Sequence, residues 1–133
     1  MSTMNRLFIF ILSTAVLVAC AGTPETLPTL EQKLAAKNYK LGDPVERIQQ
    51  WRLDSWAYLD GQHVIMQTAP STYYLVSLRQ TCHGLSSAED IAFTTTVNQL
   101  THFDKLLVRR SGGSIERCYI TALHKLEKID RKT

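Results

Sequence analysis

The chain has 133 residues, 44% of them hydrophobic, and its 15 basic and 12 acidic side chains give a net charge of +3. This length suffices for one compact domain with a core of its own but is too short for two. A charge this small argues neither for nucleic-acid binding nor for strong adhesion to anionic surfaces, so we expect no nucleic-acid partner.

The first 19 residues have the pattern of a secretory signal peptide. Arg6 supplies a positive charge, and an apolar run then extends from residue 7 to residue 18, interrupted only by Ser13 and Thr14. A helix needs about 20 apolar residues to cross a bilayer, so this run is too short to remain as a membrane span. The pattern predicts that residues 1–19 are removed.

The residues at the predicted cleavage site, Leu17-Val18-Ala19-Cys20, resemble the lipobox of bacterial lipoprotein precursors. The resemblance implies that Cys20 carries a diacylglyceryl thioether and that its new amino group is acylated. Several acyl chains together hold a protein stably on a membrane, whereas one chain holds it only marginally. An aspartate at position 21 would signal retention in the inner membrane. Ala21 therefore favours the outer membrane, facing the periplasm. The alternative is a plain secreted protein with a chance cysteine at this position.

The remaining chain divides into a lipidated tether, residues 20–28, and a single globular domain, residues 29–133. The tether is small, polar and proline-containing, which is typical of an extended linker. Loss of Arg6 with the signal peptide leaves 14 basic and 12 acidic side chains, a net charge of +2.

Two cysteines remain once Cys20 is assigned to lipid. Outside the cytoplasm, Cys82 and Cys118 most simply form a disulfide. It would close a loop of about 37 residues and stabilise the fold by about 3.8 kcal/mol. A metal site with His83 or His124 is an alternative, but the spacing matches no zinc motif. Two free thiols are the third possibility.

A short helix from Leu30 to about Tyr39 is predicted by the capping-box pattern of Thr29 and Gln32. We expect Gly42 and Pro44 to stop this helix.

The segment 56–66 places two β-rich runs on either side of Asp60-Gly61, a pair favoured in type I′ turns because both central residues need a positive φ. A second turn over residues 68–72 precedes a strand over residues 73–78. Three strands with short links predict an antiparallel meander. Alternation sends Tyr74, Val76 and Leu78 to one face of the last strand, and Tyr73, Leu75 and Ser77 to the other.

The second half of the sequence predicts a loop after Cys82, with one helical turn capped by Ser86 or Ser87. A strand is predicted over residues 90–97. A second hairpin surrounds residues 111–114 (SGGS). The final segment is ambiguous, because Ile115, Tyr119, Ala122, Leu126 and Ile129 also fall at helical spacing. The predicted fold class is α+β, mainly antiparallel β: one small domain with a meander, a second hairpin and one or two short helices.

Residues capable of catalysis are not arranged in any recognisable motif. No serine has a G-x-S-x-G setting, and the four histidines are scattered. His102 and Asp104 could form an oriented imidazole, but a loop-surface role fits them better. An unusual enzyme would need Asp90, His83, His102 or Asp104 to cluster in space. We therefore expect a protein that is not an enzyme and needs no cofactor and no metal.

Aromatic residues concentrate in the meander region: Trp51, Trp56, Tyr58, Tyr73 and Tyr74. Core packing and cross-strand pairing explain such a concentration well. If a sugar- or peptide-binding face exists, Trp56, Tyr58 and Tyr73 are the candidate residues.

Several short segments together resemble a group of small, uncharacterised proteobacterial envelope lipoproteins that share a domain of unknown function. The segments are YLVSL (74–78), Cys82-x-Gly84-Leu85, Asp90-Ile-Ala-Phe-Thr94, Asp104-Lys-Leu-Leu-Val108 and Cys118-Tyr-Ile120. The resemblance covers about Gly42 to Leu123. It implies one domain with a Cys82–Cys118 link and carries no activity over to this chain.

The sequence therefore predicts a lipoprotein of the cell envelope, held on the membrane by its acylated N-terminus. Its expected function is to bind an envelope protein or polymer. A module that binds a small ligand or a metal is the alternative.

Overall fold

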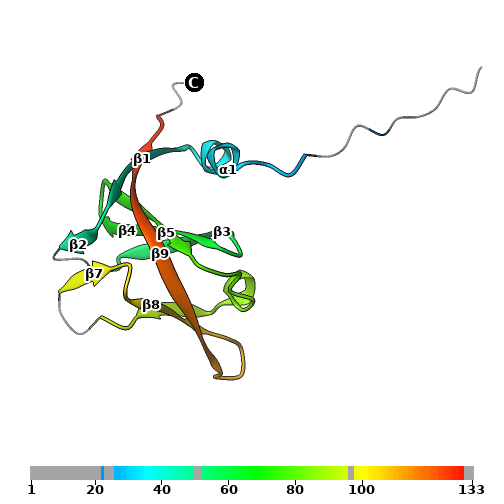
Figure 1. Cartoon of the computed structure of the whole chain (residues 1–133), viewed down its shortest axis with the longest axis vertical. Helices are drawn as coiled ribbons and strands as arrows, with labels where there is room; N and C mark the ends of the chain where they lie inside the picture. Colours follow the sequence, from blue (N-terminus) through cyan, green and yellow to red (C-terminus); the bar gives the residue numbers. More distant parts are fainter. Residues whose placement is uncertain (1–21, 23–25, 50–51, 96–97, 131–133) are drawn as a thin grey trace, which may run out of the picture.

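A computed structural model describes residues 22, 26–49, 52–95 and 98–130. It shows a small, mainly antiparallel β domain with one short α-helix, so the predicted fold class is confirmed (Figure 1). A curled sheet has the strand order β3-β4-β5-β9-β8-β6, with β1 also paired to β9, and β2 and β7 form a small second sheet.

The elements, in chain order, have the following bounds: α1 (Leu30–Ala36), β1 (Tyr39–Val45), β2 (Arg47–Gln49), β3 (Ser55–Asp60), β4 (His63–Ala69), β5 (Thr72–Leu78), the 3₁₀ turn η1 (Leu85–Ser87), β6 (Asp90–Phe93), β7 (Gln99–Thr101), β8 (Lys105–Arg109) and β9 (Ile115–Lys128).

Helix α1 begins with the predicted capping box. The Thr29 hydroxyl accepts the Gln32 N–H at 3.3 Å, and the Gln32 side chain accepts the Thr29 N–H at 2.9 Å. The predicted end of the helix is wrong: α1 stops at Ala36, because Asn38 adopts a left-handed conformation with φ 66°.

Gly42 and Pro44, which we expected to stop the helix, lie within β1 instead. Their strand pairs with β9 alone, and its register shifts between Leu41 and Pro44. A proline is tolerated at such an edge or bulge because its missing backbone N–H is not needed there for a hydrogen bond between paired strands. Gly42 is required by close approach, since a Cβ on it would lie 2.8 Å from the carbonyl oxygen of Lys125.

The predicted meander β3-β4-β5 is confirmed, with antiparallel pairing throughout. Its first turn is not type I′, however. Gly61 and Gln62 link β3 to β4, and within the described ranges only Asn38, Gly112 and Gly113 have a positive φ. The Asp60 carboxylate instead stabilises the turn by accepting the Gln62 N–H at 2.8 Å.

Strand β9 resolves the ambiguous C-terminal segment: it is a strand as far as Lys128, and the helical alternative is wrong. One edge of β9 pairs with β5, and the other pairs first with β8 and then with β1. It therefore runs through the middle of the fold (Figure 1). The helical spacing is coincidental, because Ile115, Tyr119 and Ile129 of that set are at least 40% exposed, and β9 instead buries residues on both of its faces. Leu123 belongs to one hydrophobic cluster and Leu126 to the other.

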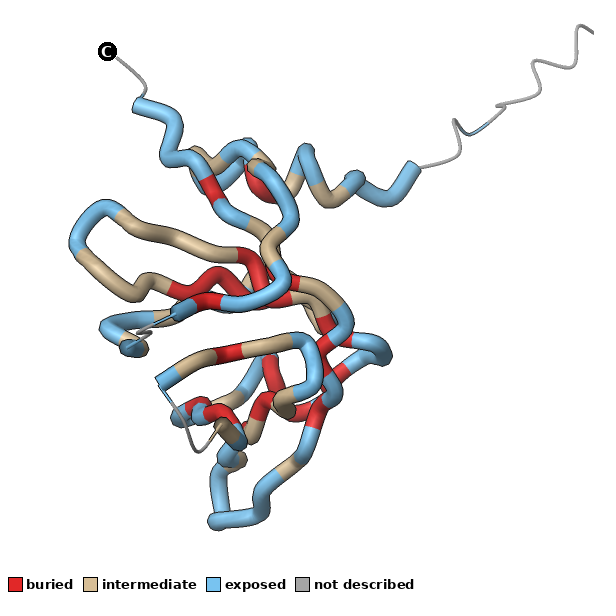
Figure 2. The backbone as a smooth tube through the Cα atoms, turned by 60° about the vertical axis from the view of Figure 1, so that its left-hand side comes forward, coloured by how far each residue is buried: buried red, intermediate tan, exposed pale blue. Residues whose placement is uncertain are grey.

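The two faces of the large sheet bury two separate clusters. Val64, Met66 and Val76 belong to the main core, which β6, β8 and the small second sheet complete. Ile65 and Leu75 face the other way and pack with Leu34 of α1. Buried positions accordingly lie inside the fold and under the helix (Figure 2).

Two smaller predictions need correction. Strand β6 ends at Phe93 rather than at Val97, and residue 97 lies outside the described ranges. The 3₁₀ turn is present, but Gly84 is its N-cap and neither Ser86 nor Ser87 caps it. The second hairpin is confirmed, and its turn uses the positive φ of Gly112 and Gly113.

Candidate functional site

A cleft lies at the end of the β5–β9 pairing. Strands β5 and β9 pair up to Leu78 and Ile120, and the Arg79 backbone N–H then donates to the Tyr119 carbonyl at 2.9 Å. The cleft beyond this point has a volume of about 320 Å³. Its lining residues are Arg79, Gln80, Thr81, His83, Glu116, Arg117, Cys118 and Tyr119. We call it the β5–β9 cleft.

The Cys82–Cys118 disulfide holds the two walls of this cleft together. The predicted disulfide is present, with a Cα–Cα distance of 5.9 Å, and both cysteines are buried. The Cys82 N–H also donates to the Gly61 carbonyl at 2.8 Å, which attaches this wall to the β3–β4 turn. The width of the cleft is therefore fixed by a covalent bond.

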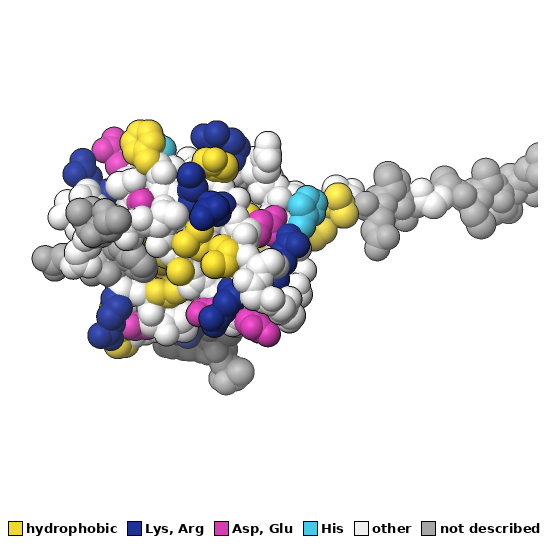
Figure 3. Space-filling model, turned by 90° about the horizontal axis from the view of Figure 1, so that it is seen from below, with side chains coloured by type: hydrophobic (Ala, Val, Ile, Leu, Met, Phe, Trp, Pro, Cys, Tyr) yellow, Lys and Arg dark blue, Asp and Glu magenta, His cyan; other side chains and the backbone are white. Residues whose placement is uncertain are grey.

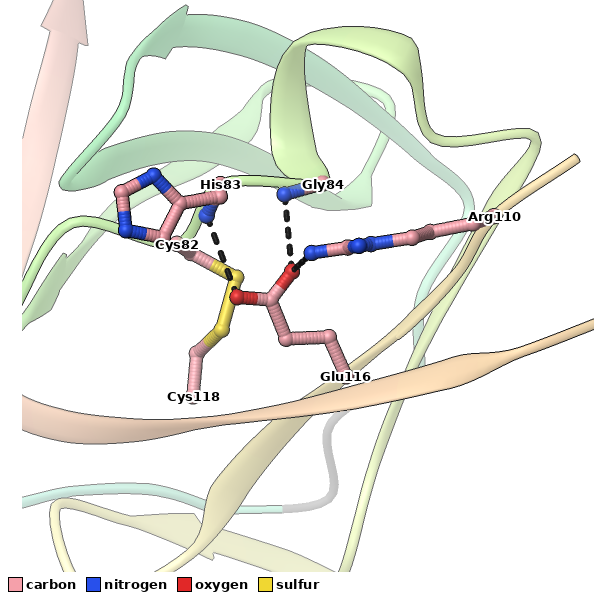
Figure 4. Close-up of a disulfide and its surroundings, with 6 residues drawn as sticks. All are labelled: Cys82, His83, Gly84, Arg110, Glu116 and Cys118. Carbon is pink, nitrogen blue, oxygen red and sulfur yellow. Dashed lines mark hydrogen bonds and ion pairs between the residues drawn. A yellow bond between two sulfur atoms is a disulfide. The ribbon is translucent and has the colours of Figure 1, made fainter.

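Glu116 is the acidic residue of the cleft, and its charge is already compensated. Its carboxylate accepts the His83 N–H at 3.1 Å and the Gly84 N–H at 2.7 Å, and it forms an ion pair with Arg110 (Figure 4). Burial alone would raise the pKa of Glu116, but these three donors outweigh it and hold the pKa below its ordinary value. A Cβ at position 84 would lie 2.8 Å from Glu116 Oε2, so a larger residue there would force this carboxylate to move.

We expect Glu116→Gln to change how stability depends on pH. A carboxyl group with a lowered pKa stabilises the fold above its unfolded pKa of 4.5 and loses this contribution as the pH falls further. The variant should therefore be less stable than the wild type above about pH 5.5, and the two should converge towards about pH 3. Urea unfolding at each pH measures this difference.

Glu127→Gln is the matched control, because Glu127 is an exposed carboxyl group on the same strand. Its unfolding free energy should differ from the wild type by less than about 0.5 kcal/mol at every pH. A Glu116→Gln difference that does not change between these pH values would contradict the assignment.

Tyr119 organises the cations around the cleft. Its ring is half exposed, with Arg79 Cζ 5.6 Å and Lys105 Nζ 5.0 Å from the ring centroid. Arg117 lies two residues away on β9 and faces the same side of the strand. In the part of the chain that the structure describes, none of these three cations forms an ion pair.

A second, apolar hollow of about 190 Å³ lies next to these residues on the outer face of β6, β8 and β9. Ala92, Leu107 and Ile115 are among its lining residues. Seen from the end where the β8–β9 hairpin lies, hydrophobic side chains gather between Lys and Arg side chains (Figure 3).

The metal alternative conflicts with the disulfide. The Sγ atoms of Cys82 and Cys118 and a carboxylate oxygen of Glu116 lie within 4.8 Å of one another. Metal-binding cysteines act as thiolates, whereas these two sulfur atoms are bonded to each other. His124 pairs with Leu75 in the sheet, six residues beyond Cys118 along β9. Among the residues that the structure describes, its buried Nδ1 has no hydrogen-bond partner.

The three aromatic residues of the candidate binding face do not share one face. Strand alternation places Trp56 and Tyr58 on one side of the sheet and Tyr73 on the other. Trp56 packs against the main core, and Tyr73 packs against the helix-side cluster. Trp56 and Tyr73 both border a hollow of about 270 Å³. Tyr58 is 39% exposed and is not among the residues that line it.

Trp51 lies outside the described residues, and Tyr74 packs against the main core. Tyr73 also contacts Tyr39, with ring centroids 5.2 Å apart. Burial raises the pKa of Tyr39, and the neighbouring Tyr73 adds to this shift.

The titratable residues considered for catalysis make separate contacts. Asp104 accepts the Thr101 N–H at 2.8 Å, and His102 stacks on Phe103. Asp90 pairs with Arg109, whereas His83 lies beside the disulfide (Figure 4). The structure does not bring these four residues together.

Sequence reasoning missed two ionic clusters. The first joins the Asp60 carboxylate to Lys33 Nζ at 2.9 Å and to His63 Nδ1 at 2.8 Å, which fastens α1 to the β3–β4 turn. Burial would raise the pKa of Asp60, but its bonds to Lys33, Gln62 and His63 lower it. The second cluster is Arg110 with Glu116. Their positions on either side of the predicted SGGS turn could have indicated that pair.

Comparison with known proteins identifies a family but no characterised relative. The chain matches the family of unknown function DUF6491 over residues 3–133. No curated protein and no solved structure matches it. No helix of the described residues is long and apolar enough to cross a membrane. Cys20 and residues 1–19 fall outside the described ranges, so the lipid anchor stays a prediction. The chain belongs to the family of unknown function DUF6491.

Proposed function

We propose that this protein is a lipid-anchored module of the bacterial cell envelope. Cys20 carries the acyl chains, and the domain binds an envelope protein or polymer without catalysing a reaction. The outer membrane, on its periplasmic side, is the proposed location, as Ala21 favours.

The disulfide is the observation that supports export most directly. Disulfides form and persist outside the cytoplasm, and Cys82–Cys118 joins two segments that are distant in sequence. The family match also begins at residue 3, so the apolar N-terminal segment and Cys20 belong to the matched region. Residues 20–28 would let the domain reach at most about 30 Å from the anchor.

The β5–β9 cleft supports binding. It is a hollow with fixed walls and several cations that have no acidic partner among the described residues. Its volume lies at the lower end of the range for ligand pockets. That size also favours the alternative of a small ligand, or of one unit of a larger polymer.

A structural role explains the one arrangement that resembles part of a catalytic triad. Asp60 orients the imidazole of His63, as an acid does in triads. However, the same carboxylate is held by Lys33 of α1 and by the turn amide, and His63 lines neither the β5–β9 cleft nor the hollow beside Tyr73. This supports a non-enzymatic domain.

The anchor is tested with Cys20→Ser in the full-length chain expressed in a Gram-negative host. Wild-type protein should incorporate labelled palmitate and sediment with membranes. The variant should incorporate none and should lose membrane sedimentation, because the acyl chains supply the attachment. Thr23→Ser, a conservative change in the tether, is the control and should behave as wild type. Unlabelled wild-type protein in the soluble fraction would refute the lipoprotein assignment.

Binding is tested by photo-crosslinking in intact envelopes. A photoreactive residue at Gln80 probes the β5–β9 cleft, and one at Tyr73 probes the other side of the sheet. A specific adduct from position 80 but not from position 73 is expected. Equal adducts, or none from position 80, would contradict binding at the cleft.

A further inference from the structure

We infer that the β5–β9 cleft binds a phosphomonoester group. The inference rests on the proposed function of a binding module and names its ligand class. The shared chemistry is a dianionic phosphate, carried either by a soluble sugar phosphate or by a lipid headgroup at the membrane surface.

The lining of the cleft is rich in hydrogen-bond donors. Arg79 stands on the wall that follows β5, and Arg117 stands on the β9 wall. Gln80, Thr81 and His83 add polar groups that can donate as well. Guanidinium groups present a planar set of donors that matches phosphate oxygens, so two arginines lining one cleft suit this ligand.

The acidic residue of the cleft does not cancel this positive character. Glu116 accepts hydrogen bonds from two backbone amides and forms an ion pair with Arg110. Its carboxylate lies between the disulfide and the Arg110 guanidinium (Figure 4). Arg79 and Arg117 are consequently left as the uncompensated charges of the cleft.

Two of the cations already contact an aromatic ring before any ligand arrives. The Tyr119 ring lies against both Arg79 and Lys105, and the backbone N–H of Arg79 donates to the Tyr119 carbonyl at 2.9 Å. The disulfide fixes the separation of the walls. Less side-chain freedom is then lost on binding, which favours affinity in a small site.

Charge and size favour a phosphomonoester over a carboxylate. Two guanidinium groups, with Lys105 beside them, complement a dianion better than a monoanion. A volume of about 320 Å³ accommodates one phosphorylated sugar or headgroup and not an extended chain.

The test uses the full chain in nonionic detergent, titrated with glucose 1-phosphate and, separately, with phosphatidic acid or phosphatidylcholine dispersed in the same detergent. Calorimetry is the readout. Saturable binding of glucose 1-phosphate identifies a soluble source. Binding of phosphatidic acid without binding of glucose 1-phosphate or phosphatidylcholine identifies a lipid source. Either result supports the inference.

Arg79→Gln and Arg117→Gln should each weaken binding by about tenfold or more, since each removes charge-assisted hydrogen bonds. Arg52→Gln is the control: it removes the same charge from an 82% exposed side chain that does not line the cleft. All three changes are at exposed positions, and thermal melting verifies that the fold is retained.

Equal loss in all three variants, or no binding of either probe by the wild type, would overturn the inference. Neither outcome affects the proposed function, because membrane retention through Cys20 and crosslinking from position 80 are measured separately. Conversely, the wild-type chain could bind glucose 1-phosphate and yet show no membrane attachment. That result would leave the ligand assignment intact and refute the lipid anchor.

Discussion

Replacing Cys118 with alanine is expected to lower the free energy of unfolding by about 4 kcal/mol. The disulfide joins residues 36 apart in sequence, and the chain-entropy model gives about 3.8 kcal/mol for a loop of this size. Both cysteines are also buried in the main core, where the lost sulfur leaves a small void. Urea unfolding under non-reducing conditions measures the change.

The double variant Cys82→Ala/Cys118→Ala is the control for the free thiol that the single variant leaves. Because the cross-link is lost only once, the double variant should differ from the single variant by much less than either differs from the wild type. A loss below about 1 kcal/mol in both variants would show that the cross-link contributes little to stability.

Replacing Leu34 with alanine is expected to cost about 2–4 kcal/mol of unfolding free energy. Leu34 is the buried residue of α1, with no exposed side-chain surface, and it packs with Ile65, Leu75 and Leu126. Without it, the seven-residue helix keeps its cap, the partly buried Leu30 and the Lys33–Asp60 ion pair. Calorimetry gives the stability, and hydrogen exchange should show faster exchange across α1.

Leu27→Ala provides the comparison, since this leucine is 85% exposed just before α1. The same chemical change there should alter stability by less than about 0.5 kcal/mol. Equal effects at positions 27 and 34 would contradict the packing of α1 on the sheet.

Local patterns predicted the elements whose causes are local. The meander and the second hairpin follow from alternation and turn residues, and the helix start follows from Thr29 and Gln32. The helix end was wrong because Asn38 took the left-handed conformation before Gly42 was reached. The C-terminal segment stayed ambiguous because exposed apolar residues such as Ile115 and Tyr119 fall by coincidence at helical spacing with the buried Leu126.

The candidate site was predictable only in its covalent part. Cysteine count and compartment indicated Cys82–Cys118, but the cleft depends on where the β5–β9 pairing ends, which is a matter of register. Arg79 and Arg117 are far apart in the sequence and meet only through that pairing. Net charge was also a poor guide to the charge of the cleft. A value near zero does not show that Glu116 is paired with Arg110 while the neighbouring cations have no acidic partner among the described residues.

The position of β9 in the sheet has a consequence for when the protein can fold. This strand pairs with β5, β8 and β1, yet it is the last strand of the described residues, and it carries Cys118. Neither the large sheet nor the disulfide can be completed until β9 is available. If the chain is exported, as we propose, it cannot complete this sheet during translocation before β9 has crossed the membrane.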